Sequence, residues 1–171
     1  MLQLSNTLLN RPIMSLRTGT QVATVTTPII NPNNLKIEGF YCIDRFTNEQ
    51  LVLLYQDIRD LIPQGFVIND HDVLSQPNEL VRLKKILNLN FELVGKPIQT
   101  ISGKKVGKVA DYATEVSTMY VQKIYAAQSI FKSLTGGSLS IDRSQINEIT
   151  NKRIVINEIE GSSPAIAPAA I

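Results

Sequence analysis

Short apolar stretches separated by polar turns recur along the chain, and this pattern predicts short β-strands joined by turns. In the N-terminal half the expected strands are Pro12–Leu16, Gln21–Pro28, Leu35–Asp44, Gln50–Tyr55 and Phe66–Asn69. In the C-terminal half they are Pro97–Ile101, Val106–Tyr112, Met119–Tyr125, Ser138–Ile141 and Arg153–Asn157. Composition agrees with this pattern, because the β-branched residues Ile, Val and Thr supply 45 of the 171 residues.

One segment between the two sets of strands has helical periodicity. Leu80, Leu83 and Leu87 recur at the spacing of one helix face, and Pro77 suits the first turn of a helix. We therefore predict one helix that lies across the strands of one half. A single helical turn is also expected over Ser144–Ile149.

The two sets of strands align as an internal repeat. Residues 8–16 match residues 93–101 at an offset of 85, and Phe66–Asn69 match Ile154–Asn157 at an offset of 88. Between these segments the offset is 84, so the second copy carries four extra residues. We place the extra residues in a longer loop at Gln128–Gly137.

Five short strands in each copy favour a small barrel that closes on itself, because closure hides the edge strands. The predicted fold class is all-β with one linker helix: two small β-barrels in tandem that pack together, for which a pseudo-twofold arrangement is one solution. The predicted boundaries are a first barrel at 6–76, a linker with the helix at 77–92, a second barrel at 93–159 and a disordered tail at 160–171.

The repeated pattern resembles the PRC-barrel family. The residues that carry the resemblance are Leu93-Val94-Gly95-Lys96-Pro97-Ile98, Ser102 to Asp111, Ile141 to Ile146 and Ile154 to Ile156. The first copy departs from the family pattern at Asn10, Ala23 and Thr27. The chain is similar to the stand-alone tandem PRC-barrel proteins of bacteria. The resemblance implies barrels used as an interaction platform, and it carries over no catalytic residue and no cofactor.

Charge and cysteine content exclude several classes of protein. The formal net charge is +2, and the chain has one cysteine, Cys42, and one histidine, His71. These residues exclude an intramolecular disulfide and a zinc site built from Cys and His alone. The N-terminal segment lacks a secretory signal pattern, and the longest apolar run, Leu51–Tyr55, is too short to span a bilayer. We expect a cytoplasmic protein.

The basic residues are unevenly distributed. Residues 1–76 contain 5 basic and 7 acidic residues, whereas residues 93–159 contain 9 basic and 5 acidic residues. Around one predicted hairpin the sequence clusters four lysines: Lys96, Lys104, Lys105 and Lys108. This cluster is either a solvated hairpin face or a binding surface for RNA, an anionic membrane surface or an acidic protein. Phe131, in the longer loop, is a second candidate contact with a partner.

Three other motifs are interpreted as structural. Asn69-Asp70-His71-Asp72 offers an imidazole and oxygens, but four consecutive residues cannot all converge on one metal ion, so an exposed turn is expected. Cys42 lies inside a predicted strand and is interpreted as a buried thiol. Gly103 to Gly107 lacks the spacing of a phosphate-binding loop and is interpreted as a hairpin turn.

The sequence therefore predicts a non-catalytic adaptor that needs no metal and no cofactor and docks on another macromolecule, most simply another protein. The first alternative is an RNA- or ribosome-associated assembly factor that uses the basic second barrel. A weaker alternative is a sensor that binds a small ligand between the barrels. An enzyme is not expected, because the sequence shows no recognisable nucleophile motif, acid–base pair or metal site.

Overall fold

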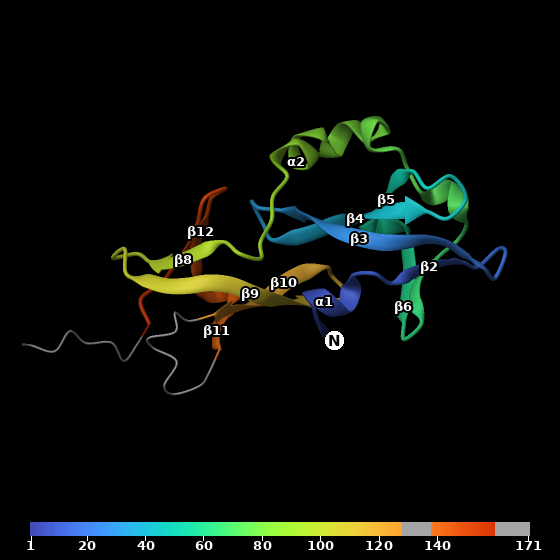
Figure 1. The fold of residues 1–171 in the computed structure, drawn as a ribbon. Helices are drawn as coiled ribbons and strands as arrows, with labels where there is room; N and C mark the ends of the chain where they lie inside the picture. Colours follow the sequence, from blue (N-terminus) through green and yellow to red (C-terminus); the bar gives the residue numbers. More distant parts are fainter. Residues whose placement is uncertain (128–137, 160–171) are drawn as a thin grey trace, which may run out of the picture.

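The computed structural model describes residues 1–127 and 138–159, and this part of the chain is mostly β-structure. Its thirteen strands all belong to one mixed sheet. Figure 1 shows the strands of the N-terminal half on one side of the molecule and those of the C-terminal half on the other. The expectation of an all-β chain with few helices is confirmed. The expected loop at Gln128–Gly137, with Phe131, and the expected disordered tail lie outside the described residues.

The N-terminal half begins with a short strand and one helical turn and continues as six strands. Its elements are β1 (Leu2–Leu4), α1 (Ser5–Leu8), β2 (Pro12–Ser15), β3 (Gln21–Asn31), β4 (Lys36–Asp44), β5 (Gln50–Leu54), the 3₁₀ turn η1 (Tyr55–Asp57), β6 (Ile58–Ile62), β7 (Gly65–Ile68) and the 3₁₀ turn η2 (His71–Val73). The C-terminal half contains β8 (Pro97–Thr100), β9 (Lys105–Glu115), β10 (Tyr120–Ala127), β11 (Leu139–Asp142), η6 (Arg143–Gln145), β12 (Ile146–Ile149) and β13 (Ile154–Ile156).

The same strand pairings occur in both halves. In the first half β2 pairs antiparallel with β3 and parallel with β7, while β4 pairs with β3 and β5, and β6 with β7. In the second half β8 pairs antiparallel with β9 and parallel with β13, while β10 pairs with β9 and β11, and β12 with β13. Each strand from β2 to β7 thus has its counterpart six strands later.

Irregularities in the strand pairing also recur at matching positions of the two halves. The β3–β4 ladder skips Thr26 on β3 and Glu38 on β4, and the β9–β10 ladder skips Ala110 on β9 and Gln122 on β10. These residues form two pairs at the offset of 84 seen in the sequence. Because a bulge bends its strand and increases the local twist, matched bulges give the long hairpins of the two halves matched curvature.

The turn before the first strand of each half explains one sequence departure. Gly95 has a φ of 88° and its N–H donates to the carbonyl of Val109, at 2.7 Å. Asn10, at the matching position, has a φ of 57° and donates to the carbonyl of Val25, at 3.0 Å. Asn tolerates the left-handed conformation better than most residues other than Gly. The replacement of Gly by Asn therefore leaves this turn unchanged.

Two expectations about secondary structure require correction. Each half has six strands after its opening turn rather than five, because β6 and β12 were not predicted. Both are edge strands that pair on one side only, and their mixed apolar and polar residues give no clear alternation. The helical turn expected over Ser144–Ile149 is wrong for residues 146–149, which form β12 after a 3₁₀ turn at Arg143–Gln145.

The sheet in each half is open in the described residues. In the first half the order of neighbouring strands is β6-β7-β2-β3-β4-β5. In the second half it is β12-β13-β8-β9-β10-β11. Within residues 1–127 and 138–159, no strand pair joins the two ends of either row. The expected closure into two barrels is therefore not seen in the strand pairing.

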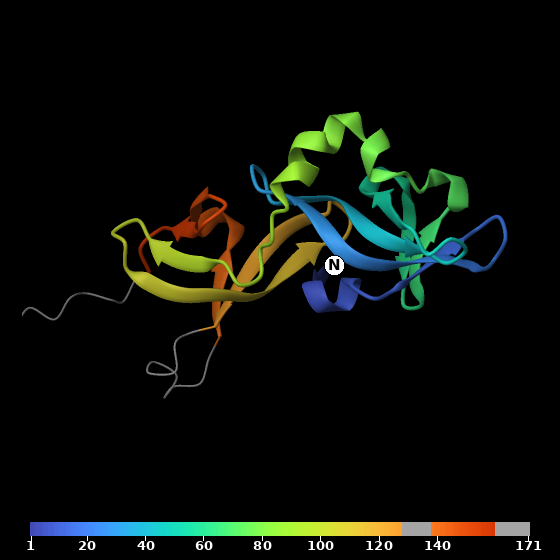
Figure 2. The same ribbon diagram turned by 45° about the horizontal axis from the view of Figure 1, so that its top comes forward.

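The predicted linker helix is broken into three pieces: η3 (Pro77–Glu79), η4 (Val81–Leu83) and α2 (Lys84–Leu89). Leu80 interrupts it, with a φ of −86° and a ψ of 69° that are not helical. The segment is anchored before its start, where Ser75 and Val52 exchange two main-chain hydrogen bonds. After this anchor the segment bends over the strands of the first half, as Figure 2 shows.

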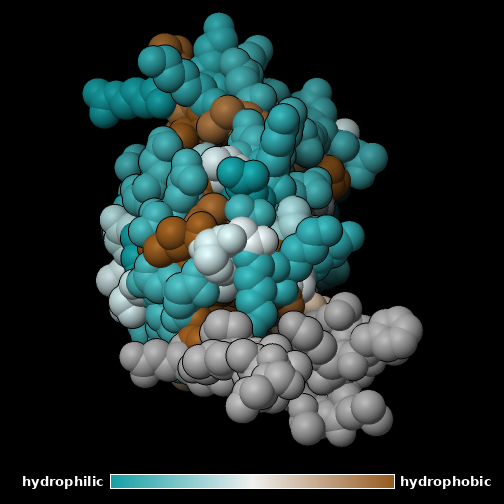
Figure 3. Space-filling model, turned by 90° about the vertical axis from the view of Figure 1, so that its left-hand side faces the viewer, coloured by the Kyte–Doolittle hydropathy of each residue, from teal (hydrophilic) through white to brown (hydrophobic). Residues whose placement is uncertain are grey.

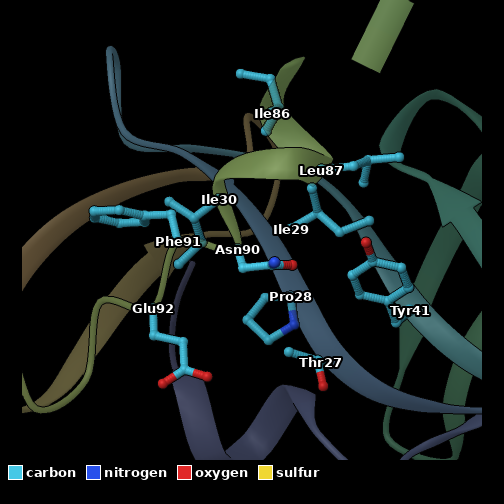
Figure 4. A pocket seen from close by; sticks show the side chains of 10 residues that line it. All are labelled: Thr27, Pro28, Ile29, Ile30, Tyr41, Ile86, Leu87, Asn90, Phe91 and Glu92. Atoms are coloured by element: carbon cyan, nitrogen blue, oxygen red, sulfur yellow. The ribbon is translucent and has the colours of Figure 1, made fainter. Parts of the chain in front are cut away.

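The final piece of the linker packs on the first half, as expected. Ile86 and Leu87 of α2 lie against β3 at Pro28 and Ile29, where they enclose a hollow of about 90 Å³ (Figure 4). The helix ends at Asn90, which has a φ of 44° and provides a left-handed C-terminal cap.

The two halves join through a short symmetric contact between β4 and β10. The N–H of Ile37 donates to the carbonyl of Met119 at 2.8 Å, and the N–H of Val121 donates to the carbonyl of Leu35 at 2.9 Å. Residues 35 and 119, and residues 37 and 121, are matched by the repeat offset of 84. Exchanging the halves therefore exchanges the two bonds, which is the relation expected of a local pseudo-twofold axis.

Two residues with buried side chains at this junction have a backbone conformation that favours glycine. Leu35 and Met119 have φ values of 54° and 58°, and each is only 2% exposed. The buried residues of both halves form one hydrophobic cluster that includes these two side chains. The side chains thus contribute packing at positions where the backbone alone would favour Gly.

The N-terminus provides a second connection between the halves. β1 pairs antiparallel with the end of β9, and the N-terminal amine forms an ion pair with Glu115. Ser5, in α1, donates from its hydroxyl and from its N–H to the carboxylate of Asp111 on β9. The first residues of the chain are therefore attached to the second half.

We predict that Leu35→Gly is less destabilising than Leu35→Ala. Both remove a buried side chain at a cost of about 2–4 kcal/mol in the free energy of unfolding. Gly also relieves the left-handed backbone, which is worth about 1 kcal/mol. Urea unfolding measures both variants. At Leu93, a buried control with no positive φ, the order should be reversed. The same order at both positions would contradict the strain at Leu35.

Candidate functional site

A large hollow in the surface lies at the far end of the second half, on the β8–β9 hairpin. It is a groove of about 910 Å³, and we call it the basic groove. The residues that line it are Pro97, Ile98, Gln99, Lys105, Val106, Gly107, Lys108, Ala127, Lys152 and Arg153. They come from β8, from the start of β9, from the end of β10 and from the turn before β13.

Four basic side chains surround the groove: Lys105, Lys108, Lys152 and Arg153. All four residues are exposed, and no ion pair with an acidic side chain is found for any of them within residues 1–127 and 138–159. None of the ten described residues that line the groove is acidic. The groove is therefore a concave surface of positive charge.

The floor of the groove is apolar. Pro97 and Val106 contribute aliphatic surface, whereas Ile98 is only 1% exposed and belongs to the core. None of the ten lining residues is aromatic. Figure 3 views the molecule from this end and shows small apolar patches surrounded by hydrophilic residues.

The first half serves as an internal reference for this site. At the positions that match Lys105 and Lys108 it has Gln21 and Thr24, at the offset of 84. At the positions that match Lys152 and Arg153 it has Gln64 and Gly65, at the offset of 88. The same strand pairings thus form with uncharged residues at all four matched positions.

The structure divides the predicted lysine cluster. Lys105 and Lys108 line the groove, but Lys96 and Lys104 do not. The Lys96 ammonium donates to the carbonyl of Asn151 at 2.7 Å and lies 4.6 Å from the centre of the Phe91 ring. Lys96 therefore has a structural role. Lys104 lies on the hairpin turn, where its charge helps to lower the pKa of Glu158.

Sequence reasoning missed Lys152 and Arg153 as members of the site. They are adjacent in the sequence, but they lie about 45 positions after Lys108, and only the parallel pairing of β8 with β13 brings them to the hairpin. A signal was present in the repeat alignment, since both residues replace uncharged ones in the first copy. Phe131, the other predicted contact, lies outside the described residues.

His71 forms an acid–base pair that the sequence did not predict. Its Nε2 lies 2.7 Å from Oδ1 of Asp44, on the far end of β4, rather than against its neighbours Asp70 and Asp72. The N–H and the hydroxyl of Thr47 donate to the other carboxylate oxygen, at 3.0 and 2.7 Å. The Asp44 side chain is 1% exposed and that of His71 is 40% exposed.

The surroundings of Asp44 give this pair a structural function. Burial acts to raise the pKa of the Asp44 carboxyl, but the hydrogen bonds from Thr47 and His71 outweigh burial, so its pKa is lowered. The carboxylate closes the β4–β5 turn, in which the N–H of Asn48 also donates to the Asp44 carbonyl at 3.0 Å. Among the described residues, no group of three or more His, Cys, Asp or Glu side chains could hold a metal ion.

Asp70 and Glu158 are matched carboxylates that stabilise matched turns. Asp70 accepts from the Ser15 hydroxyl at 3.1 Å and from the Arg17 guanidinium at 2.7 Å, on the turn after β2. Glu158 accepts from the N–H of Ser102 at 2.9 Å, on the turn after β8. Asn69 to Asp72 leave β7 and enter the 3₁₀ turn η2, as expected of a turn, but only Asn69 and Asp72 are exposed, whereas Asp70 and His71 are half-buried.

The two remaining structural interpretations are also confirmed. Gly103 has a φ of 86° and donates to the carbonyl of Thr100 at 2.9 Å, in the tight turn between β8 and β9. Cys42 is fully buried on β4. Desolvation, aided by the charge of Asp44, raises the pKa of the thiol to about 12.

Comparison with known proteins gives no assignment. No family model matches the chain, and the curated proteins give no significant match. Within the described residues, none of the helices has both the length and the apolar character needed to cross a membrane.

We predict that Asp44 makes the fold more stable above about pH 4 than below it. Its folded pKa lies under its unfolded value of 3.8, so the ionised carboxylate stabilises the fold above that value. This contribution is lost as the pH falls through the folded pKa. Thermal unfolding should show a smaller loss between about pH 5 and about pH 2 in Asp44→Asn than in the native chain. Asp72→Asn, at an exposed residue of a nearby turn, should keep the native slope.

We predict that Cys42 does not react with Ellman's reagent in the folded chain. A buried thiol with a raised pKa supplies almost no thiolate at neutral pH. Reaction should begin only when urea unfolds the protein. A Ser102→Cys variant adds an exposed thiol that should react at once. Rapid reaction of the native chain would show that β4 opens locally.

Proposed function

We propose that this protein is a non-catalytic adaptor, made of two PRC-barrel units, that docks on another macromolecule through the basic groove. The proposal keeps the cytoplasmic location that we expect from the sequence. It assigns no chemistry to the protein and requires no cofactor. One unit carries the docking surface, and the other braces it through the β4–β10 junction.

The recurrence of the strand pairings supports the assignment of two units. Matched ladders, matched bulges and matched opening turns repeat at the offsets found in the sequence. The residues that resemble the PRC-barrel pattern lie at equivalent places in this arrangement: Gly95 is in the opening turn, and Gly103 is in the β8–β9 turn.

The observation that carries the docking function is the contrast between the two halves. Lys105, Lys108, Lys152 and Arg153 surround one groove, while the first half builds the same ladders with uncharged residues at the matched positions. Four like charges around one hollow repel one another, so they do not add to the stability of the fold. A negatively charged partner would remove that repulsion.

The same observation bears on two other candidate functions. An RNA- or ribosome-associated assembly factor would use the same charges, and its affinity would fall steeply with salt. A sensor for a small ligand would need a pocket between the units, but the groove lies at one end of the molecule. The test below therefore includes RNA as an outcome.

We predict that reversing the groove charges abolishes partner capture. The full chain, tagged and added to lysate of the native organism, is compared with the double variant Lys105→Glu, Lys108→Glu. The matched control is Lys84→Glu, Lys85→Glu, which makes the same change in net charge at two exposed lysines of α2. Partners should be retained by the native chain and by the control, and lost from the groove variant.

Nuclease treatment separates the candidate functions. Partners that survive nuclease and depend on the groove support a protein adaptor. Groove-dependent partners that disappear with nuclease favour the RNA-associated reading. Equal capture by the groove variant and the control variant would show that the groove is not the docking surface.

A further inference from the structure

We infer that the basic groove binds an extended acidic segment of a partner protein, in which carboxylate side chains flank an apolar one. This inference rests on the proposed docking function and adds the chemistry of the partner. The charge of the groove, its apolar lining and its concave shape each limit which molecules can bind in it.

The charge of the rim requires an anionic occupant with several separate charges. Lys105 and Lys108 come from β9, whereas Lys152 and Arg153 come from the turn before β13, so the cations stand on two different elements. β8 lies between β13 and β9 in the sheet, so an extended occupant that crosses β8 can meet cations on both sides of it. A chain with carboxylates at intervals can do so.

The floor of the groove requires an apolar group between these charges. Pro97 and Val106 supply the accessible aliphatic surface of the groove. Burying an aliphatic side chain there removes apolar surface from water, which favours binding. A bound molecule with charged groups only leaves this apolar surface exposed to water.

The absence of aromatic side chains from the lining disfavours RNA. Proteins that bind single-stranded nucleic acid stack bases on aromatic side chains, and such stacking supplies much of the binding energy. The ten lining residues include none. Phosphate contacts alone would give weak binding without preference for sequence.

The concave shape of the groove disfavours a membrane surface. A bilayer presents its anionic headgroups as a broad plane, to which basic residues are attracted. A plane that rests on the rim of a groove of about 910 Å³ contacts less of the lining than an occupant that enters it. A peptide backbone can enter the groove.

A binding experiment with defined probes tests the chemistry of the partner. The probe is a fluorescently labelled peptide in which Glu and Leu alternate, and its anisotropy is measured with the full chain. The comparison probes are a peptide of equal length and charge in which Ser replaces Leu, an oligouridine, and vesicles of phosphatidylcholine with phosphatidylserine. The Glu–Leu peptide should bind most tightly, and raising the salt concentration should weaken its binding.

The matched variants replace the groove cations with residues that the first half uses. The groove variant is Lys105→Gln, Lys108→Thr, Lys152→Gln, and the control is Arg82→Gln, Lys84→Gln, Lys85→Gln, which removes the same charge from exposed positions in the linker. Circular dichroism checks that both fold. The groove variant should bind the Glu–Leu peptide at least about tenfold more weakly, and the control should keep its affinity.

The outcomes distinguish this inference from the proposed function. Equal binding of the Glu–Leu and Glu–Ser peptides, or equal binding by the groove and control variants, overturns the inference. Groove-dependent binding of oligouridine or vesicles without peptide binding also overturns the inference but leaves the docking function intact. If the groove variant also captures the native partners unchanged, the docking function fails as well.

Discussion

Two main-chain hydrogen bonds between β4 and β10 join two small sheets into one. Each half has few strands and a thin core, and units of this size are marginally stable by themselves. The junction places Leu35 and Met119 in the shared core, where they are buried in spite of their left-handed backbone. Once this contact forms, the two half-cores become a single hydrophobic cluster, and the distal ends of the molecule are held apart.

The stability of the junction has further sources on its surface. The Lys36 ammonium lies 4.1 Å from the centre of the Tyr55 ring and 5.8 Å from that of Tyr120, and the Arg143 guanidinium lies 4.8 Å from the Tyr120 ring. Arg143 also donates to main-chain carbonyls of both halves, at Asn34 and Val121. Cations and aromatic rings thus alternate across the boundary. Arg143 is committed to the fold, unlike the arginine and lysines of the basic groove.

Comparison of the two halves distinguishes residues that the fold requires from residues that it does not require. Asn10 and Gly95 make equivalent hydrogen bonds in the matching turns of the two halves, and so do the carboxylates of Asp70 and Glu158. The shared turns explain these residues. Where they differ while the ladders stay the same, the fold does not require the difference. The cations of the groove belong to this second group, whereas Asp44 and His71 belong to a turn of the first half. The same comparison supplies substitutions that the backbone already accommodates.

The sequence by itself determined the β-rich class, nearly all of the strand positions and the internal repeat, because short apolar runs and turn residues are local signals. It also placed Lys105 and Lys108 in a candidate site. The tertiary structure decided the rest. β6 and β12 lack a local pattern, and their strand conformation depends on pairing with β7 and β13. The linker breaks at Leu80, whose backbone is not helical although the apolar spacing around it is. His71 meets Asp44, and Lys152 and Arg153 meet the β8–β9 hairpin, only through contacts between distant residues, which periodicity in one dimension does not encode.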